Sequence, residues 1–224
     1  YLDGVSGYRN VADAYSEYLV STIKGGLYEV VKQMRDEFAQ SDFEPVKCEL
    51  LIDYNGDISP ITLDADGMLK LTLVGKVDRI DKWNGYVRIV DYKSSKKTIF
   101  VPDVLIGKNL QMLLYLYTVC KNETYGGTPA GVFYQGLAKK KGDKNSDLKL
   151  NGLVLNDMTV RNAMEKDGTS RFLPATHKTG ENPNYIESED FDIMFSYVEK
   201  RLKNIAKTIS SGDITAEPKG NKDD

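Results

Sequence analysis

Hydrophobic and polar residues alternate most clearly in the middle of the chain. The alternation predicts two β-strands, at 71–82 and 86–93. Asn84-Gly85 between them is the strongest short-range signal for a two-residue hairpin turn. The turn fixes the register, which sets the following residues opposite one another: Trp83 and Tyr86, Asp81 and Arg88, Ile80 and Ile89, Asp78 and Asp91, Lys76 and Lys93.

Helical periodicity precedes and follows this hairpin. Residues 8–23 and 27–38 carry apolar side chains at helical spacing. Because Gly25-Gly26 interrupts the pattern, we predict two amphipathic helices or one broken helix. Three further helices are predicted: an almost wholly apolar one at 109–121, a short one capped by Asn156 or Asp157 that ends at Lys166, and an amphipathic one from Ser188 to Gly212.

The remaining apolar segments predict short strands, at 45–54, 60–64, 128–137 and 148–155. The first two lead into the hairpin through turn signals, so an antiparallel meander is expected. Strand 128–137 follows a helix and is expected to lie parallel to the strand that contains Asp91. We therefore predict an α/β (α+β) fold with a mixed β-sheet core flanked by helices. The expected division is a helical segment at 1–44, a core at 45–215 and a disordered tail at 216–224.

Composition narrows the class of protein. The 224 residues are 41% hydrophobic, and 30 basic against 33 acidic residues give a net charge of −3. A chain of this length and composition is expected to form one hydrophobic core. Because the net charge is slightly negative, binding to nucleic acid would need a local positive groove. Two cysteines and no leader favour a reducing cytoplasm. No apolar run approaches a membrane span, and no G-x-x-x-x-G-K-[ST] loop for ATP is present.

The predicted hairpin register sets Asp78 directly across from Asp91. At about 5 Å and an effective dielectric near 20, two such charges repel by roughly 3 kcal/mol. Apolar residues flank them on both faces, so the strands look buried, and buried carboxylates pair with cations or bind metal. Mg²⁺ prefers carboxylate oxygens, and Lys93 beside it suits attack on a phosphodiester. The alternative is a solvated hairpin in which Lys76 and Lys93 neutralise the acids.

Several polar residues near the hairpin are candidate site residues. Gln111 and Tyr115 are four apart and share one face of their helix. A buried glutamine amide needs partners, which a lysine, a phosphate or a base edge could supply; alternatively, Gln111 meets water at the helix edge. Lys96 and Lys97 follow the hairpin and are candidates for DNA backbone phosphates, although loop lysines are mostly solubilising. Glu49, on strand 45–54, is either a further metal ligand or, more often in such a place, the partner of a cross-strand lysine.

The segments GKVDRID, IVDYKSS and GKNLQMLLYLY, in this order and spacing, resemble the RecB-type branch of the PD-(D/E)XK nuclease superfamily. Within that branch the resemblance is to AddB-type nuclease domains, from the B subunits of bacterial ATP-dependent helicase–deoxyribonucleases. It implies a restriction-endonuclease-like fold and Mg²⁺- or Mn²⁺-dependent hydrolysis of DNA phosphodiester bonds. The roles it implies are metal ligands at Asp78, Asp91 and the main-chain carbonyl of Tyr92, a catalytic lysine at Lys93, and a Q-x-x-x-Y pair, Gln111 and Tyr115, that supports the site and contacts DNA.

The resemblance also implies a context for the whole protein. It implies an exodeoxyribonuclease that acts in double-strand break repair and recombination, with a helicase–nuclease A subunit, in the bacterial cytoplasm. Its substrate would be double-stranded DNA ends, with a single strand in the active site. Two alternatives stay open. One is a stand-alone or phage- or CRISPR-associated RecB-like exonuclease, and the other is a catalytically inactive nuclease fold kept as a docking or DNA-binding scaffold.

Two features depart from the family pattern. Members of this branch often carry a metal-binding histidine upstream of the hairpin, whereas the only histidine here is His177, in a downstream loop. We therefore expect such a ligand before Tyr1. AddB-type domains also bind a [4Fe–4S] cluster through four cysteines, and Cys48 and Cys120 lack that spacing. The cluster is expected in the full-length parent, with its cysteines outside this chain.

Overall fold

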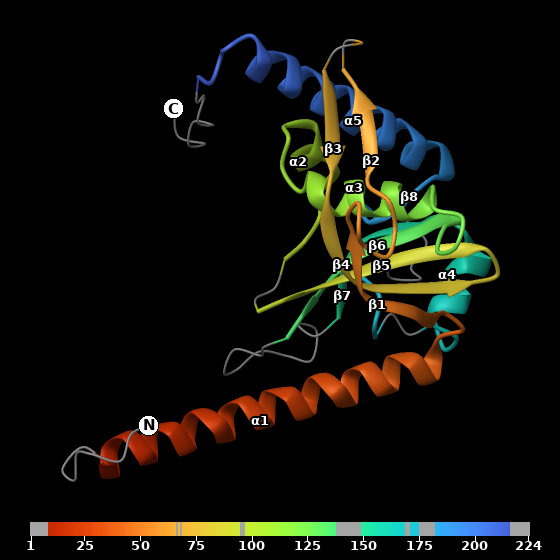
Figure 1. The fold of residues 1–224 in the computed structure, drawn as a ribbon. Helices are drawn as coiled ribbons and strands as arrows, with labels where there is room; N and C mark the ends of the chain where they lie inside the picture. Colours follow the sequence, from red (N-terminus) through yellow and green to blue (C-terminus); the bar gives the residue numbers. More distant parts are fainter. Residues whose placement is uncertain are drawn as a thin grey trace, which may run out of the picture.

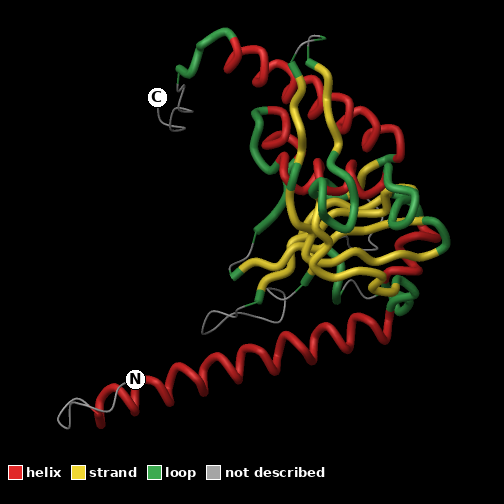
Figure 2. The backbone as a smooth tube through the Cα atoms, in the orientation of Figure 1, coloured by secondary structure: helices red, strands yellow, loops and turns green. Residues whose placement is uncertain are grey.

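The fold is known from a computed structural model, which describes residues 9–65, 67, 69–94, 97–137, 149–168, 171–174 and 182–215. Figures 1 and 2 show its arrangement, a β-sheet with helices on both sides. The predicted tail at 216–224, Lys96 and His177 lie outside the described residues.

The described residues form helices and strands in a mixed order (Figure 1). The helices are α1 (Arg9–Gln40), α2 (Val101–Leu105), α3 (Leu110–Cys120), α4 (Met158–Met164) and α5 (Ser188–Ser210). The strands are β1 (Glu44–Ile52), β2 (Ile61–Asp64), β3 (Lys70–Leu73), β4 (Gly75–Trp83), β5 (Tyr86–Lys93), β6 (Thr128–Gly136), β7 (Leu150–Leu155) and β8 (Tyr185–Ile186).

Six of the strands form one mixed sheet, in the order β1-β4-β5-β6-β7-β8. β5 and β6 pair in parallel, as the crossover through α3 predicts, while β1–β4, β4–β5 and β6–β7 are antiparallel. The predicted class, a mixed α/β sheet flanked by helices, is therefore confirmed. α3 packs on β5 and β6, and α5 packs on α3, so apolar side chains of the sheet and of these helices make one core.

The β4–β5 hairpin has the predicted register. Trp83 pairs with Tyr86, Asp81 with Arg88, and Ile80 with Ile89. Asn84 and Gly85 both have positive φ, 44° and 82°, which is the geometry of a two-residue turn of type I′. The turn chemistry alone was enough to fix which side chains of the two strands share a face.

The predicted meander before the hairpin is wrong. β2 and β3 pair with each other in a separate two-stranded sheet, and β1 pairs directly with β4. The strand predicted through residue 74 is broken there, because Val74 is exposed and belongs to neither ladder. Gly75 then passes so close to α3 that a Cβ there would lie 2.5 Å from Cε1 of Tyr115, so a side chain at this position would have to displace the Tyr115 ring. In Figure 1, β2 and β3 extend as an arm beside α5.

α1 is one continuous helix through Gly25-Gly26, so the predicted break is wrong. Glycine in a helix interior costs about 1 kcal/mol relative to alanine but does not forbid the helical conformation. Among the side chains of α1 whose burial the structure describes, the first buried one is Val30, followed by Gln33 and Glu37. The N-terminal part of α1 extends beyond the body of the molecule in Figure 2.

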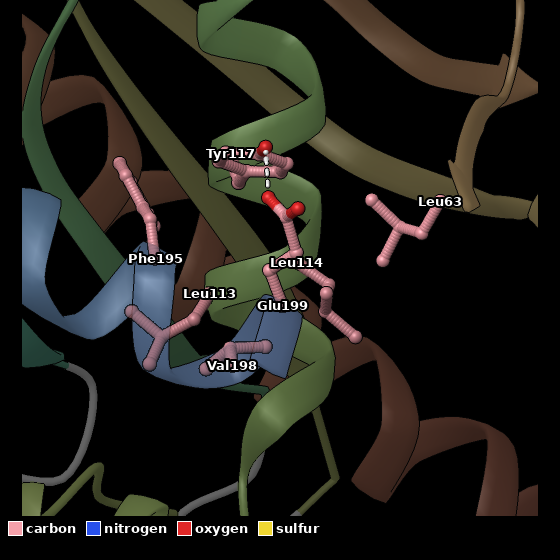
Figure 3. Close-up of a pocket in the computed structure, with 7 residues that line it drawn as sticks. All are labelled: Leu63, Leu113, Leu114, Tyr117, Phe195, Val198 and Glu199. Atoms are coloured by element: carbon pink, nitrogen blue, oxygen red, sulfur yellow. Dashed lines mark hydrogen bonds between the residues drawn. The ribbon is translucent and has the colours of Figure 1, made fainter. Parts of the chain in front are cut away.

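The contact between α3 and α5 includes a partly buried polar link (Figure 3). Tyr117 of α3 donates a hydrogen bond to Oε2 of Glu199 on α5, at 2.8 Å. Lys203, one turn further along α5, lies 2.7 Å from the other carboxylate oxygen. Leu113, Leu114, Phe195 and Val198 surround this link (Figure 3). The hydrogen bond therefore ties α5 to the helix that covers the sheet.

Glu199 should make the stability of the chain depend on pH. The Lys203 ammonium, and then the Tyr117 hydroxyl, lower the pKa of the Glu199 carboxyl below its ordinary 4.5. A lowered folded-state pKa stabilises the fold above that ordinary value, and the contribution is lost as the pH falls through the folded-state pKa. Glu199→Gln should therefore be less stable than wild type near pH 7 and equal to it in strong acid. Urea unfolding across pH 2–7 measures this, and a pH-independent difference would contradict it.

Candidate active site

The β4–β5 hairpin carries acidic and basic side chains on both of its faces. Strand alternation directs Asp78 of β4, and Asp91 and Lys93 of β5, to the face that α3 covers. Arg79 and Arg88 point to the opposite face, toward the C-terminal end of α1. The two sets are separated by the thickness of the sheet, so they form two distinct polar sites.

On the first face the structure brings Asp78, Asp91 and Lys93 together. Oδ2 of Asp78 accepts a hydrogen bond of 2.8 Å from the main-chain N–H of Tyr92, the residue next to Asp91. Asp91 is only 6% exposed. The ammonium of Lys93 lies 2.5 Å from Oδ2 of Asp91. The main chain of Tyr92 therefore joins the two carboxylates, and one amine lies beside them.

The electrostatic environment of Asp91 disfavours its charge. Burial raises the pKa of the Asp91 carboxyl above its ordinary value, the Lys93 ammonium opposes that rise, and the charge of Asp78 adds to it. Two neighbouring acids that must both ionise in a largely buried place are strained unless a cation joins them. A pKa raised by burial and by a second carboxylate is typical of sites that bind metal or transfer protons.

These residues fit a divalent cation. Oδ2 of Asp91 is buried, and its partner among the described residues is the Lys93 ammonium, 2.5 Å away. Carboxylate oxygens are the ligands that hard cations such as Mg²⁺ prefer. Among the described residues no group of three or more histidine, cysteine or acidic side chains could hold a metal. A cation at this place would therefore meet two acidic side chains from the described part of the chain, Asp78 and Asp91.

Gln111 and Tyr115 of α3 lie beside the start of β4, where Tyr115 contacts Gly75 and Lys76. Gln111 is exposed, and its Nε2 donates to the hydroxyl of Tyr115 at 3.0 Å. The same hydroxyl accepts from the main-chain N–H of Lys76, at 3.4 Å. Both side chains line a hollow of about 320 Å³, together with Leu73 and Val74. Within the described ranges, no hydrogen bond or ion pair joins either residue to Asp91 or Lys93.

Glu49 of β1 has an unusual backbone next to the same site. Its φ is +57°, in the left-handed region that side chains rarely adopt. Its neighbours Cys48 and Leu50 pair with Arg79 and Val77, so Glu49 lies opposite Asp78. Its carboxylate forms an ion pair with Lys76. This matches the interpretation of Glu49 as the partner of a cross-strand lysine.

The sequence did not single out Tyr134, which the structure places next to Asp91. The two residues are partners across the parallel β5–β6 pair. The ammonium groups of Lys93 and Lys97 lie 5.6 and 5.7 Å from the centre of the Tyr134 ring. Lys97, a predicted DNA contact, is thus near the carboxylates. No local sequence signal sets the register of two parallel strands that are joined by a long crossover. The sequence therefore could not predict which residue of 128–137 lies beside Asp91.

The opposite face of the hairpin holds a buried network of four charges. Arg88 contacts Glu37 of α1 at 2.7 Å and Asp81 at 2.8 Å. Arg79 contacts Asp81 at 2.9 Å and Glu37 at 3.4 Å. All four side chains are at most 2% exposed. The sequence predicted the Asp81–Arg88 pair, but gave no sign that Glu37, from a helix more than forty residues away, completes it.

Comparison with known proteins matches nearly the whole chain. The profile of the PD-(D/E)XK nuclease superfamily matches residues 6–221. The B subunit of an ATP-dependent helicase/deoxyribonuclease from Caldanaerobacter subterraneus is 30% identical, over 97% of this chain and 21% of its own length. The corresponding B subunit from Clostridioides difficile is 29% identical, over 96% and 21%. The chain thus spans about a fifth of the length of these relatives.

None of the described helices has the length and apolar character that a membrane crossing needs.

Proposed function

The chain belongs to the PD-(D/E)XK nuclease superfamily, and on that premise we propose that it is a metal-dependent nuclease domain that hydrolyses phosphodiester bonds of DNA. One observation carries the proposal. A buried carboxylate, Asp91, lies beside a second acid, Asp78, with the Lys93 ammonium 2.5 Å away, on one face of a hairpin. Restriction-endonuclease-like folds carry their chemistry on such a hairpin, and the mixed sheet here has that architecture.

Each residue has a proposed role. Asp78 and Asp91, with the main-chain carbonyl of Tyr92, would hold Mg²⁺ or Mn²⁺. When bound, such a cation lowers the pKa of water and neutralises charge on a phosphate. Lys93 would orient the attacking water or stabilise the negative charge that develops on the phosphate. The Tyr92 N–H orients the Asp78 carboxylate by a hydrogen bond. The backbone of β4 is fixed by pairing with β1 on one side and β5 on the other.

Gln111 and Tyr115 are proposed to contact the DNA strand and not to hold Lys93. The exposed amide of Gln111 is oriented by the Tyr115 hydroxyl, and both residues line the hollow beside β4. A glutamine amide that is fixed in this way can donate to a phosphate or a base edge. Lys97, and Lys96 beyond the described residues, would add phosphate contacts.

The wider context is also a proposal, because the chain covers a fifth of its relatives. We propose that the domain processes DNA ends in the cytoplasm as part of a helicase–deoxyribonuclease, with a helicase-bearing A subunit as partner, in break repair and recombination. Residues 45–215 would be the nuclease core, and 1–44 a helical segment that packs on it. A [4Fe–4S] cluster does not fit this chain by itself, since it needs four thiolates and the chain has two cysteines, both free.

Metal titration tests the proposal. Wild type should bind Mn²⁺ in isothermal titration calorimetry, and Asp78→Asn should bind it at least about tenfold more weakly, because it loses one of two carboxylate ligands. The matched control is Asp192→Asn, an exposed acid on α5, which should bind like wild type. Wild type should also cut linear DNA with Mg²⁺ and not with a chelator. If Asp78→Asn binds Mn²⁺ as tightly as wild type and wild type does not cut DNA, the chain would instead be an inactive scaffold.

A further inference from the structure

Tyr134 of β6 lies directly beside the proposed site without belonging to it. It pairs with Asp91 across the parallel strands and is 3% exposed. Burial, and then the charge of Asp91, raises the pKa of its hydroxyl to about 12. The hydroxyl is therefore neutral at any working pH.

Two ammonium groups share this one ring. Lys93 lies 5.6 Å and Lys97 5.7 Å from the ring centre, within the distance at which a cation is attracted to an aromatic face. Lys93 comes from the end of β5 and Lys97 from the segment that follows it. The buried ring of Tyr134 thus lies close to the ammonium groups of both Lys93 and Lys97, next to the carboxylate pair.

We propose that Tyr134 is a positioning residue, whose ring keeps Lys93 beside the carboxylate pair once a divalent cation has taken the oxygens of Asp91. This inference rests on the proposed nuclease function. It identifies a residue that acts through Lys93 and has no contact of its own with the reacting atoms.

The reason is a competition for one oxygen. The ion pair between Lys93 and Asp91 uses Oδ2 of Asp91, and a metal held by Asp91 takes negative charge from that same group. Repulsion by the metal would then drive the ammonium outward, because the Lys93 side chain is 28% exposed and free to swing into solvent. The ring face is a second partner that a hard cation does not take, since hard cations prefer oxygen ligands. The ring therefore retains the amine at the site when its first partner is lost.

Nuclear magnetic resonance can test this contact without any cleavage. The ring current of Tyr134 should shift the ε-methylene protons of Lys93 and Lys97 to lower frequency in the 224-residue chain labelled with ¹³C-lysine. The two signals are assigned by their loss in Lys93→Arg and Lys97→Arg. On saturation with Mg²⁺, the Lys93 signal should keep its shift. In Tyr134→Leu both signals should move to the values of exposed lysines, whereas Tyr134→Phe should retain them.

Cleavage kinetics give the second readout. Tyr134→Leu should lower kcat by about 5- to 30-fold, as expected for loss of one cation–π contact, and Tyr134→Phe should stay within about threefold of wild type. Lys97→Ala should mainly raise KM for DNA, which separates the two lysines. Phe133→Leu is the control for lost packing, because Phe133 is equally buried on the same strand and faces the other side of the sheet. It should lower stability and leave the lysine signals in place.

Three results would overturn the proposal: unshifted lysine signals in wild type, return of the Lys93 signal to its exposed value on Mg²⁺ binding, or equal loss of kcat in Tyr134→Phe and Tyr134→Leu. The last would assign the role to the hydroxyl. A wild-type chain that does not cut DNA would contradict the proposed function, while the magnetic resonance result would still decide whether the ring retains Lys93.

Discussion

Asp91→Asn is expected to reduce DNA cleavage to background, and Lys93→Ala to reduce it by on the order of 10²- to 10³-fold. The first variant removes the buried carboxylate of the proposed metal site, and the second removes the cation that lies 2.5 Å from it. Initial rates on an end-labelled linear duplex with saturating Mg²⁺ measure both effects. Far-UV circular dichroism should stay that of wild type, because neither side chain is part of the apolar core.

A second ion pair provides the matched control for these variants. Lys166 and Asp42 also lie 2.5 Å apart, but both are about half exposed, and among the described residues neither forms a hydrogen bond or ion pair with Asp78, Asp91 or Lys93. Asp42→Asn and Lys166→Ala make the same chemical changes as the site variants and should cut DNA at the wild-type rate. If Asp91→Asn and Lys93→Ala cut as fast as these controls, the assignment of the site is wrong.

The hairpin could be predicted from sequence because its information is local. Two turn residues, Asn84 and Gly85, set the register, and the register decides which side chains face each other over the next ten residues. That is why the pairing of Asp81 with Arg88 and the shared face of Asp91 and Lys93 followed from a short stretch of chain. The same reasoning brought Asp78 near Asp91, and the Tyr92 N–H that links them depends on that register.

What the sequence did not reveal depends on contacts between distant segments. Tyr134 lies beside Asp91 because of the register of the parallel β5–β6 pair, and no turn residue sets that register. Glu37 reaches the hairpin because the C-terminal end of α1 packs on the face that carries Arg79 and Arg88. The sequence predicted one continuous strand through Val74. In the structure that strand is divided at Val74, because β3 pairs with β2 in a separate sheet. In each case tertiary packing outweighed a local preference.

Arg88→Met should be the most destabilising single change among the polar residues of the hairpin. Arg88 is fully buried and contacts Asp81 at 2.8 Å and Glu37 at 2.7 Å, and its guanidinium lies over the ring of Phe43. Without it, two buried acids share the single positive charge of Arg79, so the site carries an uncompensated charge. Breaking a buried ion pair from one side costs about 3–5 kcal/mol. Urea unfolding followed by circular dichroism measures the loss.

A double variant separates this charge imbalance from lost packing. Glu37→Met with Arg88→Met removes one acid and one base, and leaves the pair of Arg79 and Asp81, 2.9 Å apart, as a neutral unit. The double variant should therefore be less destabilised than the sum of the two single variants, by about 1–3 kcal/mol. Replacing a buried ion pair on both sides with apolar groups is often nearly neutral. Strict additivity would show that Glu37 and Arg88 act independently and would contradict the proposed coupling between α1 and the hairpin through this pair.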